Sequence, residues 1–153
     1  IAVSVGTILI AVIALVYIVN SILGLFSSQF NFDLSIEIIL GYLFAPIAWL
    51  TGIPWDEAVV SGELLGIKTT LNEFVAYPAL AALENDELSE RSKLITFYSL
   101  CGFANLSSVG ILISGITAMA PERKDDLIKV SLKALVGATL ASCMTGLVIG
   151  IFH

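Results

Sequence analysis

Charged residues are scarce in this sequence. Asp, Glu, Lys and Arg make up 13% of its 153 residues, 58% of the residues are hydrophobic, and the mean hydropathy is +0.98. A soluble domain has about 25% charged and about 45–50% apolar residues. The balance excludes an ordinary soluble globule, a disordered chain and a disulfide-rich secreted scaffold. It predicts a protein whose solvent is membrane lipid.

Basic residues, cysteine and histidine are also few. Seven Lys and Arg oppose thirteen Asp and Glu, so the net charge of −6 leaves no basic surface for nucleic acid. The two cysteines, Cys101 and Cys143, lie inside apolar stretches, which favours buried thiols over a disulfide or a metal pair. The sequence contains no zinc-ligand cluster, phosphate loop or nucleophile elbow. We therefore expect neither an enzyme nor a bound metal or cofactor.

Long stretches without charge define the expected membrane spans. They cover residues 1–32, 38–55, 94–121 and 134–153. About 20 apolar residues cross a hydrocarbon core of ~30 Å once, and three of these stretches are long enough. We expect a multi-pass, all-α protein of the plasma membrane, or of the inner membrane if the source is bacterial. The absence of an initiator Met predicts that the chain is part of a longer protein.

The first two stretches differ in character. Residues 1–26 predict a transmembrane helix that Gly24 and Ser27-Ser28 end. Residues 27–54 predict a connection and an interfacial or re-entrant helix, because the apolar run at 38–53 has only 16 residues and contains Pro46.

Residues 55–83 are neither a clean span nor a surface loop. Their apolar run is interrupted by Glu57, Glu63, Lys68, Asn72 and Glu73. Two half-helices of ~10 residues that meet around residues 66–70 would form a re-entrant hairpin. Because lipid cannot solvate an exposed turn, such a hairpin is buried against protein or lines a wet cavity.

Residues 94–120 are long enough to span the membrane, but their middle is polar and contains glycine. The segment CGFANLSS at 101–108 can unwind locally and expose backbone groups to a ligand, so we expect a discontinuous helix. The alternative is that Asn105, Ser107 and Ser108 only form hydrogen bonds with neighbouring helices. A last transmembrane helix is expected at 134–152, after a basic connection.

Glu73 is the most informative single residue. A carboxylate at membrane depth costs a few kcal/mol or more unless it is paired, solvated or ligand-bound, so it is a functional candidate by default. The alternative is a structural partner for Lys68, five residues earlier. For Lys68 itself we favour a structural role at a helix C-terminus in the hairpin turn.

Six segments resemble the concentrative nucleoside transporters, in order and spacing over essentially the whole chain. They are GYLFAP (41–46), GIPW (52–55), GIKT (66–69), NEFVAY (72–77), CGFAN (101–105) and APERK (120–124). The fourth and fifth segments together are highly specific. The chain resembles the C-terminal half of such a transporter.

The resemblance implies secondary active transport of nucleosides by symport with sodium or protons. It implies a homotrimer in which a transport domain moves like an elevator past a scaffold. Residues 1–26 would belong to the scaffold, and residues 55–153 to the transport domain, with the hairpin at 55–83 and the broken helix at 94–120. The first re-entrant hairpin, which reads the base and builds the cation site, belongs to the family's N-terminal half, which would be this chain's partner.

The family's substrate-binding residues match four positions here. Glu73 corresponds to the glutamate that accepts hydrogen bonds from ribose hydroxyls, and Asn105 to the asparagine that contacts the ribose. Ser108 corresponds to the serine that follows one turn later, and Phe103 to the aromatic residue that lines the pocket. Lys68, Asn72 and Ser107 are expected to support the site. A non-transporting scaffold or receptor that keeps the fold is the alternative function.

Overall fold

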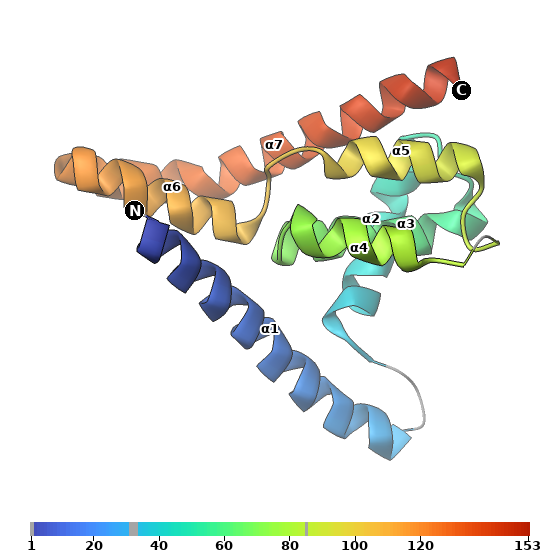
Figure 1. Cartoon of the computed structure of the whole chain (residues 1–153), viewed down its shortest axis with the longest axis horizontal. Helices are drawn as coiled ribbons and strands as arrows, with labels where there is room; N and C mark the ends of the chain where they lie inside the picture. The colour runs from blue at the N-terminus through green and yellow to red at the C-terminus, as the bar shows by residue number, and fades with distance from the viewer. Residues whose placement is uncertain (1, 31–33, 85) are drawn as a thin grey trace.

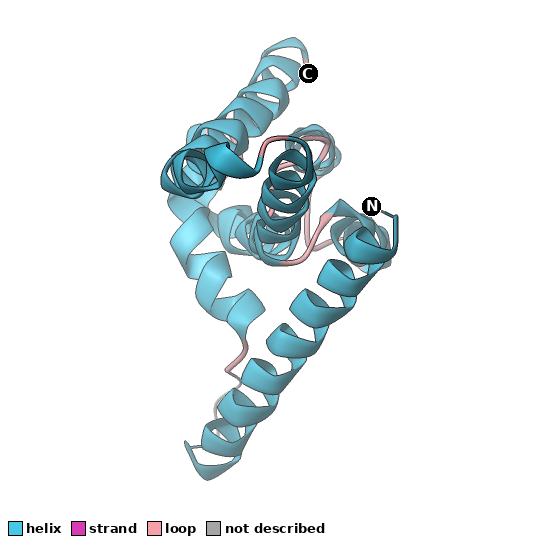
Figure 2. Cartoon of the chain, turned by 90° about the vertical axis from the view of Figure 1, so that its left-hand side faces the viewer, coloured by secondary structure: helices cyan, strands magenta, loops and turns pink. Residues whose placement is uncertain are grey.

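The chain folds entirely into helices. The structure is a computed structural model that describes residues 2–30, 34–84 and 86–153, and no strand occurs in these ranges. The elements are α1 (Ala2–Phe30), α2 (Ile36–Leu50), α3 (Trp55–Thr70), α4 (Glu73–Ala82), α5 (Glu90–Leu100), α6 (Leu106–Met119), the 3₁₀ helix η1 (Pro121–Arg123) and α7 (Lys124–Phe152). In Figures 1 and 2, α1 projects from the other helices at a steep angle. The predicted all-α fold class is confirmed.

Two stretches of the described chain are long and apolar enough to cross a membrane. They are Leu9–Phe26 in α1 and Pro121–Phe152, which comprises η1 and α7. Helices α2 and α3 satisfy the same criterion as a pair, but they are bent by 118° at the break between them. Such a bent pair is a broken span or a re-entrant element, and it joins the helix expected at 38–53 to the first half of the hairpin expected at 55–83.

Helices α1 and α7 extend beyond the transmembrane helices predicted at 1–26 and 134–152. Helix α1 continues past Gly24 and Ser27-Ser28 to Phe30, and α7 begins at Lys124 rather than at 134. Gly and Ser cost at most about 1 kcal/mol within a helix, so they do not end one that is otherwise favoured. Two aspartates in the first turn of α7 complement the helix dipole. Part of the predicted connection, residues 31–33, lies outside the described residues.

Helices α2 and α3 pack backbone against backbone. Gly52 makes the turn between them with φ +97°, a conformation that favours glycine. A Cβ atom on Gly62 of α3 would meet the carbonyl oxygen of Gly41 and would come within 2.9 Å of the amide nitrogen of Ala45, both in α2. The missing side chain of Gly62 therefore sets how closely these two helices approach.

The predicted break in the span at 94–120 is confirmed. Helix α5 ends at Leu100 and α6 begins at Leu106, with residues 101–105 outside any helix. Helix α5 lies in the core, where Ile95 and Leu100 are fully buried with Ala48 of α2 and Ala58 of α3. The first half of the broken helix is thus fixed by packing.

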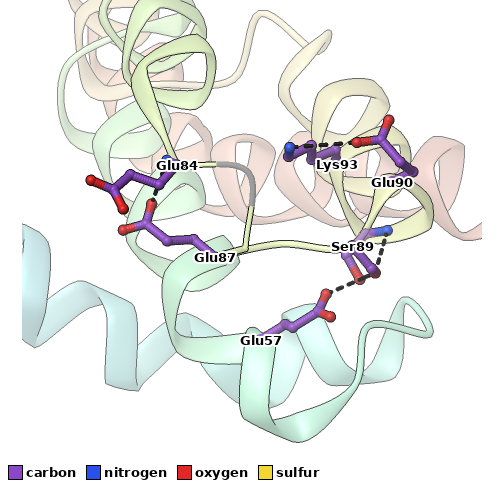
Figure 3. A network of polar contacts seen from close by, with 7 residues as sticks. Glu57, Glu84, Glu87, Ser89, Glu90 and Lys93 are labelled. Carbon is purple, nitrogen blue, oxygen red and sulfur yellow. Dashed lines mark hydrogen bonds and ion pairs between the residues drawn. The ribbon is translucent and has the colours of Figure 1, made fainter.

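The open end of the hairpin is held by polar contacts. Ser89 is the N-cap of α5, and its hydroxyl donates to Glu57 Oε2 on α3 at 3.0 Å (Figure 3). In the preceding loop, Glu84 N donates to Glu87 Oε2 at 3.2 Å. The bond from Ser89 ties the first turn of α3 to the start of α5.

Arg91 joins three segments that are far apart in sequence. From the first turn of α5, its Nη1 donates to Gly52 O and its Nη2 to Gly150 O, each at 2.6 Å. One guanidinium therefore joins the α2–α3 turn and the end of α7 to the start of α5.

The packing of α2 on α3 leads to a first prediction. In the full-length protein, we expect Gly62→Leu to lower stability by about 1–3 kcal/mol or to prevent folding, because the new side chain meets backbone that cannot rotate away. The measurement is the thermal midpoint and the monodisperse fraction in detergent. Gly137→Leu is the matched control, since nothing lies within 4 Å of a Cβ placed there. Equal stability of the two variants would contradict the proposed packing constraint.

Candidate functional site

The hairpin turns at Leu71–Asn72, later than the predicted 66–70. Helix α3 continues through Gly66 to Thr70. The hydroxyls of Thr69 and Thr70 donate hydrogen bonds to carbonyl oxygens four residues earlier in the same helix. A Cβ on Gly66 would meet the side chain of Leu40, so this glycine serves helix packing rather than the turn. The predicted position of the turn is therefore wrong by a few residues.

An asparagine caps each of the two helices that begin near this turn. Asn72 Oδ1 accepts a hydrogen bond from Val75 N at 3.1 Å at the start of α4. Asn105 Oδ1 accepts from Ser108 N at 2.7 Å at the start of α6. Ser108 Oγ completes a reciprocal capping box by accepting from Asn105 N at 3.1 Å. Each asparagine side chain thus accepts a hydrogen bond from a backbone N–H group at the N-terminus of its helix, where that group has no partner within the helix.

The hairpin tip is hydrogen-bonded to the start of α6. Asn105 Nδ2 donates to Glu73 Oε2 at 3.1 Å, and Ser107 Oγ donates to the carbonyl oxygen of Leu71 at 3.3 Å. Asn105 is fully buried, whereas Glu73 is half-buried. Asn105 therefore uses its amide oxygen for the helix cap and its amide nitrogen for the carboxylate.

Two further bonds connect the hairpin to the end of α5. The ammonium of Lys68 donates to Ser99 O at 3.4 Å, and Tyr77 Oη donates to Cys101 Sγ at 3.0 Å. The Lys68 side chain is fully buried. Together with the two bonds to α6, these contacts link residues 68–77 of the hairpin to residues 99–107 around the break.

The alternative pairing of Lys68 with Glu73 is not observed. Within the described chain, ion pairs shorter than 4.0 Å occur at Glu90–Lys93 and Arg123–Asp126 only. Lys68 does approach a helix C-terminus, but it is that of α5 and not one in the hairpin turn. Its partner carbonyl is available because the helix ends at the next residue, Leu100.

Ser108 and Phe103 face the α7 side of the break. Together with apolar residues of α6 and α7 they line a cavity of about 200 Å³. The Ser108 hydroxyl is buried and donates to Asn105 O at 2.7 Å, whereas the Phe103 side chain is exposed. The structure therefore places Glu73 and Asn105 in direct contact, and it places Ser108 and Phe103 on the same cavity wall.

One expectation about the cysteines is corrected. Both thiols are free and Cys143 is buried, but Cys101 is exposed. Cys101 lies at the C-cap of α5, where the helix stops and no following turn covers the side chain. Tyr77, which contacts it, was not singled out from the sequence, although it lies four residues after Glu73 and hence on the same helix face.

The arrangement favours a ligand that carries hydroxyl groups. The N-termini of α4 and α6 each carry partial positive charge, and Glu73 lies in the first turn of α4, where a carboxylate is stabilised. An ionised carboxylate only accepts hydrogen bonds, whereas an asparagine amide both donates and accepts. Side by side, the two groups suit a pair of neighbouring hydroxyls.

Comparison with known proteins identifies the family. The family described as "Na+ dependent nucleoside transporter C-terminus" matches residues 1–150. The chain is 40% identical over 156 residues to nucleoside permease NupC of Helicobacter pylori, and the match covers 99% of this chain and 37% of the permease. The chain thus spans well under half the length of this relative.

Solved structures agree with the sequence comparison. The chain is similar to CNTnw variants and states at 40% identity, with 99% of this chain and 38% of the other covered. The TM-score is 0.91 for a CNTnw variant in the intermediate 2 state and 0.84 for CNTnw in an inward-facing substrate-bound state. The chain therefore belongs to the concentrative nucleoside transporter family, a family of integral membrane transporters and not of enzymes, and corresponds to its C-terminal region.

Proposed function

We propose that the full-length protein containing this chain carries nucleosides across the membrane in symport with a cation. Support comes from the family's description, which names Na+ dependence and nucleosides, and from the substrate-bound state of a similar structure. Sodium is therefore favoured over protons as the coupling ion. The chain itself supplies the ribose-binding side, and the N-terminal half supplies the base-reading and cation-binding residues.

The hydrogen bond between Asn105 Nδ2 and Glu73 Oε2 is the observation that carries this proposal. It brings an acceptor on the hairpin and a donor at the helix break to one point. A ribose bound there would donate its hydroxyls to the Glu73 carboxylate and would contact the Asn105 amide. The exposed ring of Phe103 would line the pocket, and Ser108 would hold Asn105 and contact the sugar from the third position of α6.

Three further residues support the site by holding its parts together. Asn72 caps the helix that carries Glu73, and Ser107 binds the hairpin tip. Lys68 fixes the hairpin against the end of α5. In this proposal α1 is part of the scaffold of a homotrimer, α2 is the interfacial helix, and the remaining helices belong to a transport domain that moves like an elevator.

A non-transporting scaffold or receptor is the alternative function. It accounts for the fold, but it gives no reason for a half-buried carboxylate to lie beside an unwound segment instead of an apolar side chain. In a membrane bundle such polar groups are costly, and they mark substrate pathways by default.

The first prediction for this function concerns coupling. Proteoliposomes of the full-length protein should accumulate uridine when an inward Na+ gradient is imposed. Replacement of Na+ by K+ on both sides is the control and should abolish accumulation. A proton gradient tested in parallel identifies proton coupling. Failure of both gradients to drive accumulation would favour the non-transporting alternative.

The second prediction concerns Glu73. Glu73→Gln should lower the uptake efficiency, Vmax/KM, by about tenfold or more, because the neutral amide offers one acceptor oxygen instead of two and loses the charge that strengthens hydrogen bonds from the ribose hydroxyls. The measurement is uridine uptake normalised to the protein present in the membrane. Glu84→Gln is the matched control, since this glutamate is exposed and outside the site. Uptake by Glu73→Gln equal to that of the control would remove Glu73 from the site.

The third prediction concerns the sugar. Nucleosides that lack one ribose hydroxyl should bind more weakly by about 1–3 kcal/mol, because a desolvated acceptor is left without its donor. Competition against uridine uptake measures this difference. In Glu73→Gln the penalty for the missing hydroxyl should shrink. An unchanged penalty in the variant would mean that another residue recognises the hydroxyl.

A further inference from the structure

Asn20 is a polar residue within the apolar span of α1, and both polar atoms of its side chain have partners on α2. Its Nδ2 donates to Glu37 Oε1 at 3.0 Å and Oε2 at 2.9 Å. Its Oδ1 accepts from the backbone nitrogen of Ile36 at 2.8 Å. None of the site contacts described above involves this group.

These bonds cap α2 from another helix. Ile36 is the first residue of α2, so its amide has no partner within the helix, and Asn20 supplies one. Glu37 lies in the first turn, where its negative charge is favourable. Separation of α1 from α2 would leave an amide, a carboxylate and a backbone donor unsatisfied in apolar surroundings. The contact is therefore directional and costly to break.

The other contacts of α1 are of a different kind. Only 6% of its apolar window is buried, and Val16 is the buried hydrophobic side chain among the described residues of α1. Apart from α2, α1 packs against α6 (Figure 1). Apolar contacts are not directional, so one such surface can slide along another at lower cost than the hydrogen bonds of Asn20 can be broken.

The chain fits two states of the similar transporter to different degrees. At the same 40% identity, the TM-score is 0.91 for the intermediate 2 state and 0.84 for the inward-facing state. The chain therefore superposes more closely on the first of these two structures than on the second.

We propose that Asn20 and Glu37 form a fixed polar joint, about which α1 and the rest of the chain change their relative orientation during transport. The proposal rests on the proposed transport function. The two residues are positioning residues, since they hold the start of α2 and touch no substrate. Loss of the joint should slow the conformational change and leave the affinity for nucleoside intact.

The test reverses the polarity of the hydrogen bond in the full-length transporter. Asn20→Asp keeps the acceptor for Ile36 N but sets a second carboxylate against Glu37. Glu37→Gln keeps an acceptor for Asn20, and in the double variant it supplies the donor that the introduced aspartate requires. The readouts are Vmax and KM of nucleoside uptake per protein in the membrane, together with nucleoside binding by the purified protein as evidence of folding.

We expect Asn20→Asp to lower Vmax by about tenfold with KM unchanged, Glu37→Gln to resemble the wild type, and the double variant to regain most of the loss. A wild-type Vmax for Asn20→Asp, a raised KM, or no rescue in the double variant would overturn the joint. If Asn20→Asp does not fold, Glu37→Ala decides: it should lower Vmax, and a wild-type Vmax would overturn the proposal. Absence of uptake by the wild type would instead refute the proposed function.

Discussion

Backbone groups freed at a helix end inside apolar surroundings must find partners within the protein, and the site is organised by this constraint. The hairpin turn and the helix break each expose such groups, because lipid offers no hydrogen bonds. Asn72 and Asn105 cap the two helix N-termini, and Lys68 reaches the C-terminal end of α5. Asn105 and Lys68 also bind the two irregular segments to each other.

Helix α7 packs closely against the break and against α5, which precedes it. A Cβ on Gly102 would meet Ser142 Oγ on α7, and a Cβ on Gly146 would meet Ser99 Oγ and the carbonyl oxygen of Ile95. The unwound segment therefore contacts α7 on one side and the hairpin on the other. Its position follows from contacts with both, which is what a precise binding geometry requires.

Polar residues form hydrogen bonds at both ends of the hairpin. At its open end, the exposed Ser89 and the half-buried Glu57 join the start of α5 to α3. Those at the tip are buried or half-buried and fix helix ends, and Glu73 is the glutamate that lies beside the break. The buried Asn72, Asn105 and Ser107 thus lie where a helix begins, whereas Ser61 and Thr96 are buried within helices and form a hydrogen bond with each other.

Local patterns in the sequence determined the membrane class, the presence of a hairpin and the break at 101–105, because each depends on neighbouring residues alone. Tertiary structure decided the turn at Leu71–Asn72, the start of α7 at Lys124 and the exposure of Cys101. It also decided the partners of Lys68, Asn105 and Asn20, which lie between 16 and 32 residues away along the chain. Hydropathy and spacing indicate whether a residue is buried from water and which face of its helix it occupies. Which group completes its hydrogen bonds depends on how distant helices pack, and this the local sequence does not contain.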